Sequence, residues 1–276
     1  MKTPVVQANN ATIPVIGFGT WKIMGADCTD AVCYALEVGY RHIDTAAIYQ
    51  NEEAVGAGIR LSKVPREDIF VTTKIWYQDA SEERLFQAAE ESLKRLNLSD
   101  VNLLLLHWPS PEFPLEGTMK ALSAAKKKGL ARHIGISNYP SNLIEKAVAL
   151  ATEPLVTNQC EYHPFLSQEK VRETCFKHGL SFTSYSPLGH GKLLDLPEVK
   201  VIADQLGRTP AQVILRWHIQ QPQTIVIPKS SSAQRIAENF KIFDFELNPD
   251  QMQQISNLHK PDGRMINPDF APVWDE

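Results

Sequence analysis

Val101-Asn102-Leu103-Leu104-Leu105-Leu106 is the stretch that decides the fold of this sequence. Its almost continuously apolar character is typical of a strand that is covered on both faces of a parallel sheet. Similar short apolar runs, rich in residues that favour strands, recur along the chain. We therefore expect eight strands, over residues 14–20, 41–46, 69–75, 101–107, 132–137, 155–161, 181–186 and 224–229.

Segments with helical periodicity separate these runs. Ser81-Glu82-Glu83-Arg84 predicts the start of one helix, and Thr209-Pro210-Ala211-Gln212 combines an N-cap, a proline at the first helical position and a box-like glutamine. The longer connection between the last two runs predicts an extra helix near residues 198–206. The strand starts recur about every 30 residues, which is the length of a strand plus a crossover helix.

This alternation predicts an α/β protein with a single (β/α)8 TIM barrel over residues 1–276, because no Pro-, Gly- or Ser-rich linker divides the chain. Residues 5–16, around Asn9-Asn10, predict a short β-hairpin before the barrel. An open, doubly wound sheet is the competing architecture, because the number of strands counted from a sequence is fallible.

The composition indicates a globular protein that acts on small molecules. Of 276 residues, 43% are hydrophobic and 22% are charged, which permits a large core. A formal net charge of -4 argues against nucleic-acid binding. Because Met1–Gln7 lacks the apolar part of a signal peptide and no apolar run is long enough to span a membrane, we expect a cytoplasmic protein without a membrane partner. Nothing in the sequence requires more than a monomer.

The four cysteines, Cys28, Cys33, Cys160 and Cys175, form no C-x-x-C pair. No group of Cys and His residues has zinc-like spacing. We therefore expect reduced, inert thiols and no metal site.

Four ionisable residues fall at the ends of three consecutive predicted strands. Asp44 ends one strand and Tyr49 lies in the loop after it, while Lys74 and His107 end the next two strands. Active sites of (β/α)8 barrels lie at the carboxyl ends of the strands. We therefore expect the four side chains to point toward one rim.

These four groups together can protonate an oxyanion as it develops. A tyrosine is a weak acid, and we expect the Lys74 ammonium to lower the pKa of Tyr49 while Asp44 keeps Lys74 charged. A neutral His107 can donate a hydrogen bond to a carbonyl oxygen. Each residue alone is more often an ion-pair member or a core histidine, but their joint placement favours catalysis.

Six motifs are spread along the chain. They read Gly39-Tyr40-Arg41-His42-Ile43-Asp44-Thr45-Ala46-Ala47-Ile48-Tyr49-Gln50-Asn51-Glu52, Thr73-Lys74-Ile75-Trp76, Leu106-His107-Trp108-Pro109, Gly135-Ile136-Ser137-Asn138, Ser184-Tyr185-Ser186-Pro187-Leu188-Gly189 and Ile225-Val226-Ile227-Pro228-Lys229-Ser230. In these motifs the sequence resembles the aldo-keto reductase family, most closely its bacterial 2,5-diketo-D-gluconate and methylglyoxal reductases. The resemblance implies a catalytic tetrad of Asp44, Tyr49, Lys74 and His107, with Tyr49 as the general acid.

A carbonyl reductase without flavin or metal signals needs a nicotinamide as its hydride donor. The Rossmann fingerprint is missing, because no third glycine follows Gly17-Phe18-Gly19 in register. Barrels commonly bind phosphate in the loops after strands seven and eight, which here are residues 186–192 and 229–235. From the residues alone, Ser231 and Gln234 could instead cap a helix in which Arg235 is solvated.

The resemblance implies that the cofactor is NADPH. Lys229, Ser230 and Arg235 would bind its 2'-phosphate, and the fork of donors on Arg235 would favour NADPH over NADH. The same resemblance implies that Glu238 and Asn239 face the adenine, that Ser137, Asn138 and Gln159 bind the nicotinamide carboxamide, and that Tyr185 stacks on its ring. The other expected cofactor contacts are Gly19, Thr20, Trp21, Asp44, Ser186, Leu188 and Gly189.

Three tryptophans follow strand ends near the expected rim. Trp21, Trp76 and Trp108, with Tyr49 and His107, would line an apolar substrate pocket, although the indoles could instead fill space between the barrel and its helices. The C-terminal residues 265–276, which include an aromatic pair at 270 and 274, are expected to cross the mouth of the barrel and select substrates.

The sequence thus predicts an NADPH-dependent reductase that converts aldehydes or ketones to alcohols. Keto-sugars, methylglyoxal, other aldehydes and keto esters all remain candidate substrates. Two alternatives stay open: a nicotinamide-nucleotide-sensing binding protein on the same fold, and a lyase or isomerase barrel acting on sugar phosphates.

Overall fold

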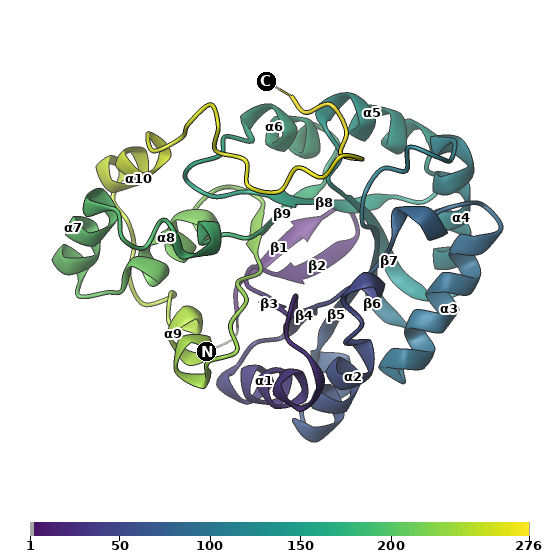
Figure 1. The fold of residues 1–276 in the computed structure, drawn as a ribbon, viewed down its shortest axis with the longest axis horizontal. Coiled ribbons are helices and arrows are strands. Elements are labelled where there is room, and N and C mark those ends of the chain that lie inside the picture. The colour runs from purple at the N-terminus through teal and green to yellow at the C-terminus, as the bar shows by residue number, and fades with distance from the viewer. Residues whose placement is uncertain (1–2, 276) are drawn as a thin grey trace.

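A parallel sheet of eight strands forms the centre of the computed structural model, which describes residues 3–275 (Figure 1). In sheet order the strands are β3 (Phe18–Gly19), β4 (His42–Asp44), β5 (Phe70–Ile75), β6 (Val101–Leu106), β7 (Ala131–Ser137), β8 (Leu155–Glu161), β9 (Ser181–Tyr185) and β10 (Thr224–Val226). Each strand pairs with the next one along the chain. The eight predicted strands are confirmed, several of them shorter than expected.

Bridges between the first and last strands close the sheet into a barrel. Ile16 pairs in parallel with Val226, and Gly19 pairs with Lys229. This seam requires glycine, because a Cβ on Gly19 would lie 2.9 Å from the carbonyl oxygen of Ile227. The predicted TIM barrel is therefore confirmed, and the competing open sheet was wrong.

Helices surround the barrel (Figure 1). After β3 to β8 come α1 (Gly25–Val38), α2 (Glu52–Leu61), α3 (Arg84–Leu96), α4 (Leu115–Lys127), α5 (Ser141–Leu150) and α6 (Glu169–Lys177). Between β9 and β10 lie α7 (Pro197–Leu206), which is the predicted extra helix, and α8 (Pro210–Ile219); α9 (Ala233–Phe240) and α10 (Pro249–Ser256) follow β10. The short 3₁₀ turns are η1 (Ala47–Tyr49), η2 (Arg66–Asp68), η3 (Tyr77–Asp79) and η4 (Gly189–Gly191). The predicted capping box of Thr209 and Gln212 at the start of α8 is confirmed.

Helix α9 begins one residue later than its sequence pattern predicts. The hydroxyl of Ser232, and not that of Ser231, accepts a hydrogen bond from the Arg235 backbone N–H. The cause is a turn before the helix, in which the Ser230 hydroxyl accepts from the Ser232 N–H at 3.1 Å. This turn shifts the capping position along the chain.

A β-hairpin precedes the barrel, as predicted, and packs against its amino-terminal end. Strands β1 (Val5–Ala8) and β2 (Ala11–Pro14) are antiparallel, and Asn9 in their turn has a φ of 47°. The Asn9 amide donates to the carbonyl oxygen of Leu155, the first residue of β8. In Figure 1 the hairpin lies across the centre of the ring. Its apolar side chains join a cluster with five barrel residues: Phe70, Leu103, Leu105, Val156 and Ile225.

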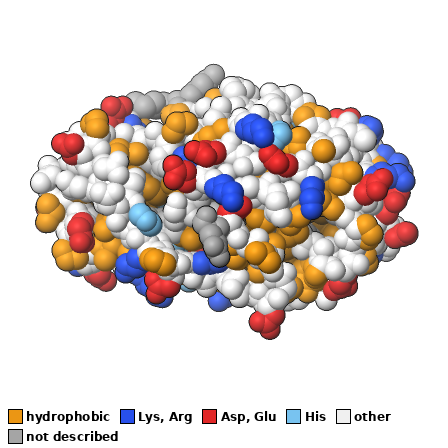
Figure 2. All heavy atoms as spheres, turned by 90° about the horizontal axis from the view of Figure 1, so that it is seen from above, with side chains coloured by type: hydrophobic (Ala, Val, Ile, Leu, Met, Phe, Trp, Pro, Cys, Tyr) orange, Lys and Arg blue, Asp and Glu red, His pale blue; other side chains and the backbone are white. Residues whose placement is uncertain are grey.

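The charges on the surface and the lengths of the helices can be compared with what nucleic-acid binding and membrane insertion require. On the face shown in Figure 2, acidic and basic side chains are interspersed, so this face has no continuous basic area for nucleic-acid phosphates. Within residues 3–275, no helix is both long enough and apolar enough to cross a membrane.

Candidate active site

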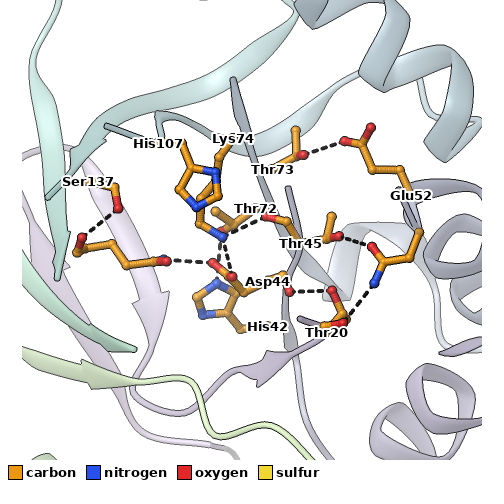
Figure 3. Close-up of polar contacts among 12 residues, drawn as sticks. Thr20, His42, Asp44, Thr45, Glu52, Thr72, Thr73, Lys74, His107 and Ser137 are labelled. Carbon is orange, nitrogen blue, oxygen red and sulfur yellow. Dashed lines mark hydrogen bonds and ion pairs between the residues drawn. The ribbon is translucent and has the colours of Figure 1, made fainter. Parts of the chain in front are cut away.

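The carboxyl ends of β4 and β5 hold a buried ion pair (Figure 3). The Lys74 Nζ lies 2.5 Å from Asp44 Oδ1 and donates to the carbonyl oxygen of Thr45 at 2.8 Å. The two charged side chains are 0% and 2% exposed, so water contributes little to their solvation. A buried charge needs a partner and further hydrogen bonds, and this arrangement supplies both.

Tyr49 and His107 lie beside this pair. Tyr49 belongs to the η1 turn that follows β4, and the Lys74 Nζ is 5.1 Å from the centroid of its ring. The His107 ring, just past the end of β6, packs edge-on against Tyr49 with 5.6 Å between centroids. The structure thus brings together all four residues of the predicted tetrad.

Burial and charge act in opposite directions on Tyr49 and Lys74. Burial raises the pKa of Tyr49 more than the Lys74 charge lowers it, so the net direction is upward. Lys74 lowers the pKa of Tyr49 as expected, but desolvation of the phenolate outweighs its attraction to the ammonium, so the net shift is not downward. Burial lowers the pKa of Lys74, but Asp44 and Tyr49 together raise it further, and the net direction is again upward. At neutral pH the phenol is protonated and the amine is charged.

His107 is neutral. Burial, followed by the charge of Lys74, lowers the pKa of His107 well below its usual range. The backbone of His107 is fixed by Asn138, whose Nδ2 donates to its carbonyl oxygen at 2.9 Å. A neutral imidazole carries one N–H, which can donate to a carbonyl oxygen without competing as an acid.

Hydrogen bonds connect the predicted carboxamide-binding residues to the ion pair. Tyr185 Oη donates to Asn138 Oδ1 at 2.8 Å, Ser137 Oγ donates to the Gln159 carbonyl oxygen at 2.7 Å, and Gln159 Nε2 donates to Asp44 Oδ2 at 2.8 Å. Asn138 has a φ of 65°, a conformation that non-glycine residues adopt infrequently and that recurs at functional sites. Within residues 3–275, Gln159 Oε1 accepts no hydrogen bond, so it can accept one from an amide.

The loop after β3 is tied to the same rim. Thr20 Oγ1 donates to the Asp44 carbonyl oxygen at 3.0 Å, and Asn51 Nδ2 donates to the Thr20 carbonyl oxygen at 2.8 Å. Thr45 Oγ1 donates to Asn51 Oδ1 at 2.9 Å. The sequence patterns assigned no role to Thr45 or Asn51, although both lie inside the first motif. Trp21, in this loop, is 38% exposed at the mouth.

The two cations expected to bind phosphate are free to do so. Lys229 and Arg235 are exposed, and within residues 3–275 neither lies within 4.0 Å of a carboxylate. Arg235 is in the first turn of α9, where backbone N–H groups favour an anion. Gly19 bridges to Lys229, so this loop adjoins the loop after β3.

The remaining residues predicted to bind the cofactor differ in backbone conformation, burial and hydrogen bonding. Ser186 and Gly189, after β9, have φ of 49° and 53°, and Leu188 between them is half-buried. The carboxylate of Glu238 accepts a hydrogen bond from the Thr209 hydroxyl at 2.8 Å. Asn239 is buried, at 4% exposure.

Aromatic rings continue from His107 toward the C-terminus. The Trp76 ring lies 5.3 Å from His107 and 5.6 Å from Phe270, and the Trp108 ring lies 5.5 Å from Phe270. Trp108 is only 5% exposed, and its ring contacts are with Phe270 and Trp274 of the C-terminal residues. Residues 265–275 lie near the strand ends in the expected place; Glu276 is outside the described residues.

This geometry can be compared with known proteins. The model of the Aldo/keto reductase family matches residues 15–260, which is most of the chain. The chain belongs to the aldo/keto reductase family. The resemblance carried by the six motifs is thereby confirmed, and an oxidoreductase acting on carbonyl groups replaces the alternative of a sugar-phosphate lyase or isomerase.

Individual relatives of this aldo/keto reductase agree with the assignment. The methylglyoxal reductase DkgB of Escherichia coli is 42% identical over 267 residues, covering 95% of this chain and 99% of that protein. A solved structure named as a candidate 2,5-diketo-D-gluconic acid reductase B has a TM-score of 0.98 at 42% identity, covering 99% and 98% of the two chains. The aldo-keto reductase of Bombyx mori, solved in complex with NADP, has a TM-score of 0.90 at 34% identity, covering 98% and 96%.

Proposed function

We propose that the protein uses NADPH to reduce the carbonyl group of small aldehydes or ketones, with Asp44, Tyr49, Lys74 and His107 as its catalytic residues. The observation that carries this proposal is the buried Lys74–Asp44 pair beside Tyr49, with a neutral His107 packed edge-on against the same phenol ring. The names of two similar proteins, a methylglyoxal reductase and a candidate diketogluconic acid reductase, support a small polar carbonyl compound as substrate.

Each residue of the site has a separate role in protonating the carbonyl oxygen. Bound NADPH supplies the hydride that the carbonyl carbon receives. The Tyr49 hydroxyl donates its proton to the carbonyl oxygen, and the Lys74 ammonium stabilises the phenolate that remains. Asp44 keeps Lys74 charged in its buried position. His107 donates a hydrogen bond to the same oxygen and so orients the carbonyl group, while Trp21, Trp76 and Trp108 line the pocket.

The surroundings of the site fit NADPH. Within residues 3–275, the Lys229 and Arg235 cations have no carboxylate partner, and a guanidinium suits a phosphate because its donors form a fork. Gln159 Oε1 is the acceptor left for a carboxamide, and Asn138 holds Tyr185 in place for stacking. We propose further contacts to the cofactor from Gly19, Thr20, Trp21, Asp44, Ser137, Ser186, Leu188, Gly189, Glu238 and Asn239.

The test is a panel of carbonyl substrates assayed with NADPH and with NADH. We expect oxidation of NADPH with methylglyoxal or a keto-sugar, and slower oxidation of NADH. Tight binding of NADPH without turnover of any carbonyl compound would overturn the proposal and favour a nucleotide-sensing protein. Size-exclusion chromatography coupled to light scattering would test the accompanying proposal that the chain is a single-domain monomer.

A further inference from the structure

A buried carboxylate outside the proposed tetrad binds the C-terminal segment. Glu161 ends β8, two residues beyond Gln159, and its side chain is 0% exposed. Glu161 Oε1 accepts from the backbone N–H of Met265 at 2.8 Å, and Oε2 accepts from that of Ile266 at 2.9 Å. His163 Nε2 lies 3.0 Å from Oε1. Both carboxylate oxygens therefore bind consecutive amides from a distant part of the chain.

A second carboxylate holds the other end of this segment. Asp275 Oδ2 accepts from the backbone N–H of Ser141 at 2.7 Å and from its hydroxyl at 3.0 Å, and Lys170 is 3.5 Å away. Ser141 begins α5, so Asp275 acts as an N-terminal cap from outside the helix. Figure 1 shows the C-terminal segment, in yellow, running from α10 past α6 to α5.

Contacts within the segment make it one unit. The Arg264 guanidinium carbon lies 3.6 Å from the centroid of the Trp274 ring, and Trp274 Nε1 donates to Asn267 Oδ1 at 2.8 Å. The segment, residues 264–275, is thus folded onto itself between its two anchors. Asp275 is 13% exposed and Glu161 is fully buried, so Glu161 is the anchor that water competes with least.

The segment places Phe270 on the aromatic side of the proposed pocket. The Phe270 ring lies 4.5 Å from Tyr77, 5.6 Å from Trp76 and 5.5 Å from Trp108. Because Trp76 also contacts His107, a series of ring contacts joins the proposed catalytic histidine to Phe270. The position of the segment therefore sets where this wall of the pocket lies.

We propose that Glu161 is a positioning residue, which holds residues 264–275 against this aromatic wall and thereby determines which carbonyl compounds bind tightly. A substrate large enough to reach Phe270 gains contact area from the anchored segment. Methylglyoxal is too small to extend from Tyr49 to Phe270 and gains none. The substrate-selecting part of this inference rests on the proposed function, whereas the anchoring part does not.

Limited trypsin digestion tests the anchor without any assay of activity. Arg264 precedes Met265, Lys260 precedes a proline that blocks trypsin, and residues 265–276 contain no Lys or Arg, so cleavage after Arg264 releases this peptide alone. Glu161→Gln keeps the size of the side chain, but its amide nitrogen cannot accept one of the two N–H groups. We expect release about ten to a hundred times faster than from the wild-type protein, the range that follows from losing a hydrogen bond to a charged group.

Glu173→Gln is the matched control, because Glu173 is exposed on α6 and, within residues 3–275, its carboxylate forms no hydrogen bond or ion pair. Its peptide should be released at the wild-type rate. Equal rates for Glu161→Gln and the wild type would overturn the anchoring role. If Glu161→Gln fails to fold, Ile266→Pro removes the N–H that Oε2 accepts and is expected to give the same acceleration.

Kinetics with two substrates test the selecting role. For Glu161→Gln with 4-nitrobenzaldehyde we expect KM to rise about tenfold, with kcat and the KM of methylglyoxal changed less than about twofold. Phe270→Ala should reproduce this pattern, since it removes the contact and leaves the anchor intact. Equal rises in KM for both substrates would overturn the selecting role. If no carbonyl compound is reduced, the proposed function fails, and trypsin digestion still decides whether Glu161 is the anchor.

Discussion

Replacing Asp44 by asparagine tests the buried ion pair directly. The substitution keeps the size of the side chain and one acceptor oxygen, but it leaves the fully buried Lys74 ammonium without the carboxylate that now lies 2.5 Å away. The carbonyl oxygen of Thr45, at 2.8 Å, still accepts from it. Removing one partner of a buried pair costs about 3–5 kcal/mol, and because asparagine retains an acceptor we expect the lower end, about 3 kcal/mol.

This loss should be visible in thermal denaturation followed by circular dichroism. For a chain of this size, about 3 kcal/mol corresponds to a decrease in Tm of about 6–12 °C. We also expect kcat to fall at least about 10²-fold, because an uncharged Lys74 no longer stabilises the phenolate. Asp195→Asn is the matched control, since its partner Lys200 lies at a similar 2.9 Å, but the pair is 88% and 50% exposed and water replaces the lost contact.

The pH dependence of this difference has a definite sign. In the wild-type protein the pKa of Lys74 is raised, so its stabilising effect is present at neutral pH and is lost only as pH rises through the folded-state value. In Asp44→Asn, burial dominates and lowers that pKa, so the variant should lose less stability near about pH 10 than at neutral pH. The reasoning is refuted if Asp44→Asn melts at the same temperature as Asp195→Asn at neutral pH.

Three further predictions concern single side chains. Tyr49→Phe should lower kcat by about 10²–10⁴-fold while the Kd of NADPH, measured by fluorescence quenching, stays the same; unchanged turnover would show that another group is the acid. Arg235→Ala should reduce the preference for NADPH over NADH by about tenfold in kcat/KM, whereas Arg60→Ala, on the exposed side of α2, should not; a preference that persists would place the phosphate elsewhere. Burial lowers the pKa of His42 to about 4. Because the unfolded chain then binds the proton first, stability to urea should decline from about pH 6.5 to pH 4 by up to about 3 kcal/mol, and less steeply in His42→Gln; equal slopes would contradict this.

The strands of the barrel were predictable from the sequence because short runs rich in strand-forming residues recur about every 30 residues, and β6 in particular is buried on both faces and almost entirely apolar. The residues at which the strands begin and end were harder to predict. The first run was expected over 14–20, but the hairpin takes Ala11–Pro14 and the seam with the last strand takes Ile16, which leaves only Phe18–Gly19 as β3. Closing a barrel is a long-range event, and the local pattern around Ile16 cannot show it.

In the site, too, features set by neighbouring residues could be predicted from the sequence, and features set by residues far along the chain could not. The clustering of Asp44, Tyr49, Lys74 and His107 could be predicted, because each lies at or just after a strand end and within a motif. The net direction of the Tyr49 pKa could not, because it depends on how completely other elements bury the ring. Glu161 was missed for a similar reason, since its partners, Met265 and Ile266, are 104 and 105 positions further along the chain. A carboxylate at the end of a strand that begins with Leu155 and Val156 was the one signal available.

The hairpin covers the amino-terminal end of the barrel with apolar side chains. Val6 and Ile13 pack at that end in one buried apolar cluster with the Phe70 and Leu103 side chains. We therefore expect the carbonyl substrate to enter, and the alcohol product to leave, at the carboxyl ends of the strands. If a dinucleotide occupies the loops beside Lys229, substrate and product both pass residues 264–275 in each turnover. The rate of product release can then limit kcat as much as the chemical step does.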